Sequence, residues 1–120
     1  METQTVNLKE LLLFIKENKN ISANLILDEG CSITVADRKP LIKVINYVMN
    51  YLEQFTEQPL EISLDLFPDE CSLTFLAYSA QEELPALSEQ LAGALQDYRA
   101  TLDLSHEPGR FVQIRIHFQK

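Results

Sequence analysis

The chain has 120 residues, of which 46% are hydrophobic and 23% charged, as is typical of one globular domain that buries its own core. It carries 18 acidic against 10 basic residues, for a formal net charge of −8. Such a surface repels nucleic-acid phosphates and anionic lipid headgroups, so we expect neither a nucleic-acid nor a membrane partner. The apolar stretches are far shorter than the roughly 20 residues that a membrane helix needs.

The amino terminus and the two cysteines bear on the compartment. The first five residues, Met-Glu-Thr-Gln-Thr, lack the basic region, apolar segment and cleavage site of a secretion signal, which predicts a cytoplasmic protein. Cys31 and Cys71 have no CxxC spacing and no histidine nearby in sequence. This pattern argues against zinc and predicts two reduced thiols, at strand edges or in the core.

The first third of the chain predicts one helix and two strands. Apolar residues at helical spacing over Leu8–Lys16 indicate a short helix with Asn7 as its cap, ending near Asn18–Asn20. Alternating apolar residues then indicate a half-buried strand over Ile21–Leu27, and a shorter strand follows over Cys31–Ala36.

A long helix is predicted next. Asp37 can cap its start and Pro40 suits its first turn, where a missing N–H is not required. We expect it to reach about Thr56. Its apolar residues form one broad stripe that needs a large packing partner, such as a sheet: Leu41, Val44, Ile45, Val48, Met49, Leu52 and Phe55.

The second half predicts a hairpin, a helix and two more strands. Leu60–Phe67 and Ser72–Tyr78 are separated by a short turn and predict an antiparallel hairpin. A second long helix is expected over Glu82–Arg99, followed by strands near Leu102–Ser105 and Phe111–Phe118. Residues 1–120 are therefore expected to form a single domain, an α/β two-layer sandwich with helices on one face of a mixed, mostly antiparallel sheet.

The helix from Asp37 to Thr56 also resembles a known motif. Its sequence, DRKPLIKVINYVMNYLEQFT, is similar to the first ATP-site helix of the histidine-kinase-like ATPase (GHKL) superfamily, roughly D-x-x-x-L-x-x-V-L-x-N-L-L-x-N-A-x-K-Y-T. The resemblance extends to Thr5–Leu12 as the segment before the site, Leu60–Tyr78 as the hairpin and Leu102–Phe118 as the closing strand pair. It implies the Bergerat-type (GHKL-like) fold of a histidine-kinase ATP-binding domain.

The same resemblance implies that the nucleotide site has been lost from the long helix. The two helix asparagines of the family, one of which orients Mg²⁺, correspond to Tyr47 and Tyr51. Asn46 and Asn50 of this chain stand one position earlier, and a shift of one residue rotates a side chain by about 100°. They are therefore not expected to point into the same pocket.

The glycine boxes of the family are also missing. The D-x-G-x-G box corresponds to residues 78–84, YSAQEEL, and the histidine-glycine-glycine motif to residues 98–100, YRA. The lid and the second glycine-rich loop, whose amides hold phosphate at a helix start, are reduced to a few residues. The chain has only three glycines, too few for a phosphate cradle.

These absences predict a degenerate pseudo-ATPase that is not an enzyme, with no catalytic, cofactor-binding or metal residues and no cofactor. The predicted role is a non-catalytic protein-interaction or regulatory module in bacterial signal transduction. The expected partner is a signalling protein or a second copy, and no nucleotide is expected. Two alternatives stay open: a residual ATP or ADP site that uses Asn46 or Asn50, and a small-molecule sensor that uses the vestigial pocket.

The remaining candidates carry no clear chemistry. Tyr47, Tyr51 and Tyr78 could fill the vacated pocket, line a docking surface or simply pack. His106 and His117 are expected to face solvent. No triad motif surrounds the serines at 32, 79 and 88. The acid pairs at 28–29, 69–70 and 82–83 fall at predicted turns or a helix start, where carboxylates act as caps.

Overall fold

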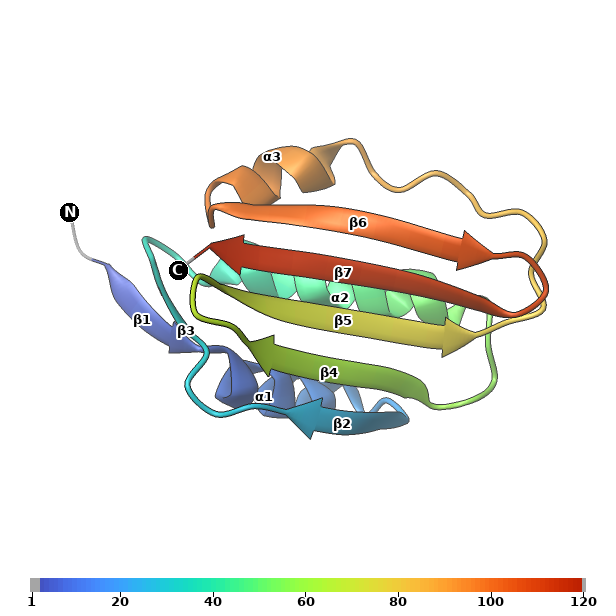
Figure 1. The fold of residues 1–120 in the computed structure, drawn as a ribbon, viewed down its shortest axis with the longest axis horizontal. Helices are drawn as coiled ribbons and strands as arrows, with labels where there is room; N and C mark the ends of the chain where they lie inside the picture. Colours follow the sequence, from blue (N-terminus) through green and yellow to red (C-terminus); the bar gives the residue numbers. More distant parts are fainter. Residues whose placement is uncertain (1–2, 120) are drawn as a thin grey trace.

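A five-stranded sheet forms one layer of the molecule in the computed structural model, which describes residues 3–119 (Figure 1). The strand order is β2-β4-β5-β7-β6. Only β2 and β4 are parallel, and every other neighbouring pair is antiparallel, which confirms the predicted sheet. The strands are β2 (Ala23–Leu27), β4 (Leu60–Leu66), β5 (Glu70–Tyr78), β6 (Ala100–Glu107) and β7 (Phe111–Gln119).

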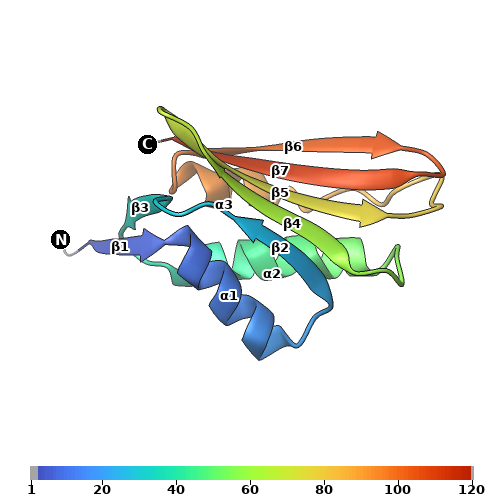
Figure 2. The same cartoon turned by 60° about the horizontal axis from the view of Figure 1, so that its bottom comes forward.

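The helices form the second layer. α1 (Leu8–Lys19), α2 (Lys39–Glu53) and α3 (Gln90–Gln96) all lie on the same side of the sheet (Figure 2). The core between the layers contains the apolar stripe of α2 and the alternate residues of the central strands, such as Leu73, Phe75, Ile114 and Ile116, each of which is 0% exposed. The predicted two-layer α/β sandwich is confirmed.

One strand was not predicted. β1 (Gln4–Asn7) pairs antiparallel with β3 (Ser32–Val35) in a separate two-stranded sheet. β1 has one buried side chain, that of Val6, so its sequence shows no alternating pattern. Its pairing with residues far along the chain defines it, and local patterns do not record such a pairing.

The caps of the first two helices follow the sequence. The Asn7 side chain accepts the Glu10 N–H at the start of α1. Before α2, Asp37 Oδ1 accepts the Lys39 N–H at 3.0 Å, although the residue in the cap position is Arg38. α2 ends at Glu53 and not at Thr56.

The second long helix, predicted over Glu82–Arg99, is wrong over its first half. The helical part is α3, only seven residues long. Residues 79–89 run as irregular chain, which we call the strap. Pro85 explains the difference, because it has no N–H to donate and disfavours helical geometry at Leu84. The apolar spacing of Leu84 and Leu87 arises because both side chains pack against the core from the strap.

The remaining findings concern the thiols and membrane helices. Cys31 and Cys71 are both buried thiols, as predicted for a core position. Among residues 3–119, none of the helices has the length and apolarity to cross a bilayer. The prediction drawn from the amino terminus rests partly on Met1 and Glu2, which lie outside the described residues.

Candidate functional site

The candidate site is the face of α2 that the strap covers. The hydroxyl of Tyr51 donates to the carbonyl oxygen of Pro85 at 2.6 Å. One helical turn earlier, the hydroxyl of Tyr47 accepts the N–H of Ser88 at 2.9 Å. The two rings are stacked with centroids 6.3 Å apart, and Phe55 meets Tyr51 edge-on at 5.2 Å. An aromatic ladder on α2 therefore holds the strap through its backbone.

A third tyrosine acts at the other end of α2. The hydroxyl of Tyr98 donates to the Asp37 carbonyl oxygen at 2.6 Å and accepts the Leu41 N–H at 2.9 Å. The first N–H groups of a helix have no partner within the helix, so this hydroxyl satisfies one of them from the end of α3. We call Tyr47, Tyr51 and Tyr98 the tyrosine clamp.

Burial affects the acidity of two clamp residues. It raises the pKa of Tyr51, and the neighbouring Tyr47 raises it further. Burial also raises the pKa of Tyr98; the hydrogen bond from Leu41 opposes this shift, while Asp37 and Asp97 add to it. Both hydroxyls therefore stay protonated at neutral pH and remain available as donors.

The strap is also held at its start. The Gln81 carbonyl oxygen accepts the Gly109 N–H at 3.2 Å and lies 2.9 Å from His106 Nε2, so this ring nitrogen carries a hydrogen. Gly109 has φ of 79° in the turn between β6 and β7, a conformation that suits glycine. His106 was predicted to face solvent, but it fastens the strap to the end of the sheet.

A cavity lies where α2, α3 and the strap meet. Its volume is about 260 Å³, and its lining includes Pro40, Lys43, Tyr47, Ser88 and Leu91. Lys43 is the one charged side chain in the lining. The cavity is shallow and open to solvent, so it would enclose only part of a small ligand, and an anionic group would suit Lys43 best.

Asn46 and Asn50 lie elsewhere. Both line a groove between α1 and α2 together with Phe14 and Lys19, and Lys19 Nζ donates to Asn50 Oδ1. Tyr47 and Tyr51, one position further along the helix, face the strap instead. The rotation expected from the one-residue shift is therefore present.

A polar cluster on the open face of the sheet was missed by sequence reasoning. His117 Nδ1 lies 3.0 Å from Glu70 Oε2 and 3.1 Å from Ser72 Oγ, and Nε2 lies 3.1 Å from Asp103 Oδ2. Cross-strand register brings these residues of β5, β6 and β7 together, which no sequence spacing reveals. Ser72 is 4% exposed, and its hydroxyl and the Glu70 carboxylate both contact Nδ1 of His117. The cluster therefore ties strands together and does not present a nucleophile.

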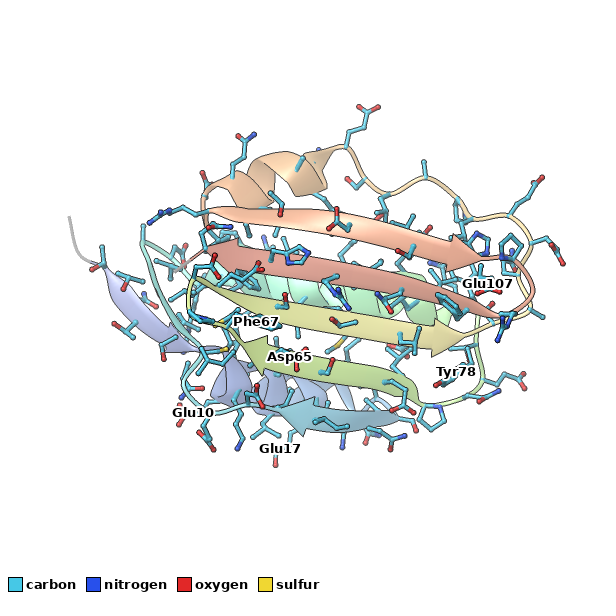
Figure 3. The ribbon with its side chains drawn as sticks, in the orientation of Figure 1. Glu10, Glu17, Asp65, Phe67, Tyr78 and Glu107 are labelled. Atoms are coloured by element: carbon cyan, nitrogen blue, oxygen red, sulfur yellow. The ribbon has the colours of Figure 1, made fainter. Side chains whose placement is uncertain are left out.

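Of the other predicted candidates, Ser88 contacts the clamp through its N–H, whereas Tyr78, Ser79 and Asp28 have no hydrogen bond to it among the described residues. Tyr78 is 44% exposed at the end of β5 (Figure 3). The hydroxyls of Ser79 and Ser88 accept backbone N–H groups two residues further on, as in turns. Asp28 Oδ2 accepts the Leu66 N–H at 2.9 Å. Within residues 3–119, no three His, Cys, Asp or Glu side chains are grouped so as to hold a metal ion.

Comparisons with known proteins give structural neighbours only. No protein-family model and no curated protein matches the chain. The histidine kinase AdeS of Acinetobacter baumannii matches with a TM-score of 0.77 at 11% identity, over 99% of this chain and 68% of that one. The histidine kinase domain of the E. coli osmosensor EnvZ gives 0.77 at 10% identity, over 99% and 89%. A nucleotide-free catalytic domain of the histidine kinase ThkA gives 0.73 at 17% identity, over 100% and 99%.

This comparison overturns one prediction. The chain was predicted not to be an enzyme, but a neighbour that it covers almost end to end is named as a catalytic domain. The prediction rested on missing glycine motifs and displaced asparagines, whereas the fold of a histidine kinase catalytic domain is matched over the full length of this chain. The chain has the fold of the catalytic domains of histidine kinases.

Proposed function

We propose that this domain is a protein-binding module of a signal-transduction system, and that the chain's own backbone closes its α2–strap face against nucleotide. The observation that carries the proposal is the pair of hydrogen bonds that join α2 to the strap: Tyr51 donates to the Pro85 carbonyl oxygen, and Tyr47 accepts the Ser88 N–H. Tyrosines stand there at the positions where the resemblance places the two helix asparagines, one of which orients Mg²⁺. The shared kinase fold supports a place in signalling, although fold alone does not fix an activity.

The chemistry of the closed face favours protein contact. The Tyr51 hydroxyl already donates its hydrogen to the Pro85 carbonyl oxygen, so it is not available as a donor to a phosphate, and the Tyr47 hydroxyl is tied to the strap as the acceptor of the Ser88 N–H. The strap also contains Glu82 and Glu83, and their negative charges repel a triphosphate. The helix and strand surfaces outside the clamp remain open to a partner.

The alternative is a ligand in the cavity beside Lys43. The cavity between α2 and α3 has a volume of about 260 Å³. The groove at Asn46 and Asn50 is larger, about 510 Å³, but it lies on the other side of α2 from Tyr47 and Tyr51. A nucleotide would have to displace the strap from Tyr47 and Tyr51. A smaller anionic metabolite could enter without that displacement.

A thermal melt with and without millimolar Mg-ATP tests the proposal. A ligand at 100 times its dissociation constant stabilises a fold by about 2.7 kcal/mol, so bound nucleotide gives a clear rise in the melting temperature. We expect no shift with Mg-ATP or Mg-ADP. A Mg-dependent rise would refute the closed face and establish nucleotide binding.

The partner is tested separately. Light scattering over a concentration series distinguishes a second copy from a different protein as the partner. We expect a monomer, because a net charge of −8 opposes self-association.

A further inference from the structure

β6 is an open edge of the five-stranded sheet (Figure 1). The Gln119 N–H donates to the Arg99 carbonyl oxygen at 3.1 Å, next to the paired residues Ala100 and Phe118. Hydrogen-bonded and non-hydrogen-bonded pairs alternate along an antiparallel ladder. The backbone groups of Leu102 and Leu104 therefore point away from β7, and neither residue has another backbone partner within residues 3–119.

This edge lacks most of the usual protection against pairing, although α3 and the strap run alongside it (Figure 1). Natural edge strands are guarded by lysine, proline, bulges or shortness. β6 is eight residues long, contains neither lysine nor proline, and pairs with β7 in one unbroken register. An added strand would therefore find a regular row of donors and acceptors.

An apolar groove runs beside the same edge. Its volume is about 380 Å³, between β6 on one side and α3 with the end of the strap on the other. Leu87, Leu91, Leu95 and Leu102 provide its apolar lining, and Leu104, further along β6, is 42% exposed. A strand placed against β6 would direct every second side chain toward this groove.

The surroundings of the groove are acidic. Between residues 84 and 110 the sequence has four acidic residues against two Lys or Arg, Arg99 and Arg110. The acids are Glu89 and Asp97, which flank α3, and Asp103 and Glu107 on β6. The Asp103 side chain is 73% exposed, with its Oδ2 3.1 Å from His117 Nε2. Glu107, which pairs with Arg110 at 2.7 Å, lies at the far end of the strand (Figure 3). The charge complement of this rim is a cationic segment.

We propose that β6 receives an extended segment of a partner protein, with alternating apolar and basic side chains, as a sixth strand. Backbone hydrogen bonds to the open edge provide affinity, apolar side chains enter the groove, and basic side chains meet the acidic rim. A second copy of this chain fits poorly, because pairing β6 with itself brings two acidic rims together. The inference rests on the proposed protein-binding function and assigns it a surface.

The test uses the whole chain and a ten-residue peptide of alternating lysine and valine as the probe. Amide NMR of the labelled protein should show shifts at Leu102 and Leu104 on titration. The matched glutamate–valine peptide should bind about tenfold more weakly because of charge repulsion. No binding of the lysine peptide at millimolar concentration, or shifts outside β6 and the groove, would overturn the proposal.

Two variants separate backbone pairing from apolar contact. Leu104→Pro removes an outward N–H without removing a bond to β7, and should weaken lysine-peptide binding about tenfold. Leu104→Ala keeps the N–H and should weaken it less; equal loss in both variants would contradict strand addition. A concentration-dependent dimer that Leu104→Pro abolishes would make the occupant a second copy. None of these results depends on the Mg-ATP melt, so the two proposals can fail independently.

Discussion

Single hydroxyl groups decide how the candidate site is closed. Each clamp tyrosine bonds to main-chain atoms, and its ring packs against neighbours on α2 or the core. The sequence identified Tyr47 and Tyr51 as the residues at the asparagine positions, but it left open whether they pack, dock or fill the pocket. Their bonding to the strap depends on where residues 85 and 88 lie. That position could not be predicted, because residues 82–89 form irregular chain instead of the expected helix.

The first prediction concerns Tyr51. Tyr51→Phe leaves the Pro85 carbonyl oxygen without the hydroxyl that donates to it, and should lower the free energy of unfolding by about 1 kcal/mol. Hydrogen exchange of strap amides should become faster. Tyr78→Phe is the matched control, since Tyr78 is 44% exposed and outside the clamp. Equal effects of the two substitutions would argue against a clamp.

The second prediction concerns Tyr98. Its hydroxyl serves both the Asp37 carbonyl oxygen and the Leu41 N–H, so Tyr98→Phe leaves two backbone groups unsatisfied. We expect a loss of about 1–3 kcal/mol in chemical denaturation, more than for Tyr51→Phe. A smaller loss would mean that water replaces the hydroxyl at the start of α2.

The third prediction concerns alkaline pH. The pKa values of Tyr51 and Tyr98 are raised in the folded state above the unfolded value of about 10. A raised pKa gives stability that is present below pH 10 and is lost as pH rises through the folded pKa. Ultraviolet titration of tyrosinate should therefore show two groups ionising late, one of which disappears in each Phe variant. Four tyrosines that titrate together near pH 10 would contradict this expectation.

At the scale of elements, periodicity predicted what local sequence can encode. α1, α2 and the β4–β5 hairpin were found because each has an apolar period over its whole length. The prediction of a helix over Glu82–Arg99 was wrong over its first half. The apolar spacing there is compatible with a helix, but the ring and the missing N–H of Pro85 exclude a continuous one. β1 and the His117 cluster were not predicted for a different reason. Both depend on the register between strands that are distant in sequence.

The fourth prediction tests the short helix that remains. Gly93 lies inside α3, and a Cβ built there has no heavy atom within 4 Å. Gly93→Ala should therefore stabilise the domain by about 0.5–1 kcal/mol through helix propensity and a less flexible unfolded chain. Gly109→Ala is the contrasting variant and should destabilise, because Gly109 has φ of 79°. Thermal melts of both variants provide the measurement, and a destabilising Gly93→Ala would show that α3 is not helical at this position.

At the scale of the molecule, packing around the sheet sets the order of local stability. β5 has paired strands on both sides and contributes fully buried residues to the core. β1 and β3 form a separate two-stranded sheet, and the strap has only a few fixed backbone bonds. The whole domain therefore combines a stable centre with margins that open at lower cost.

The fifth prediction follows from that order. Native-state hydrogen exchange should be slowest in β5 and β7, faster in β1 and β3, and fastest in the strap. Strap amides that exchange as slowly as those of β5 would mean that the strap unfolds only with the entire domain.

Tyr47 and Tyr51 of the clamp hold the strap through its backbone and not through its side chains. Both contacts reach main-chain atoms, the carbonyl oxygen of Pro85 and the N–H of Ser88, so charged positions such as Glu82 and Glu83 take no part in them. Exposed positions such as Glu82 and Glu83 can therefore change while the path of the strap stays the same, whereas Pro85 and the core-packed Leu84 and Leu87 are constrained. Substitutions at the exposed positions of the strap could therefore change which proteins it binds without changing the fold.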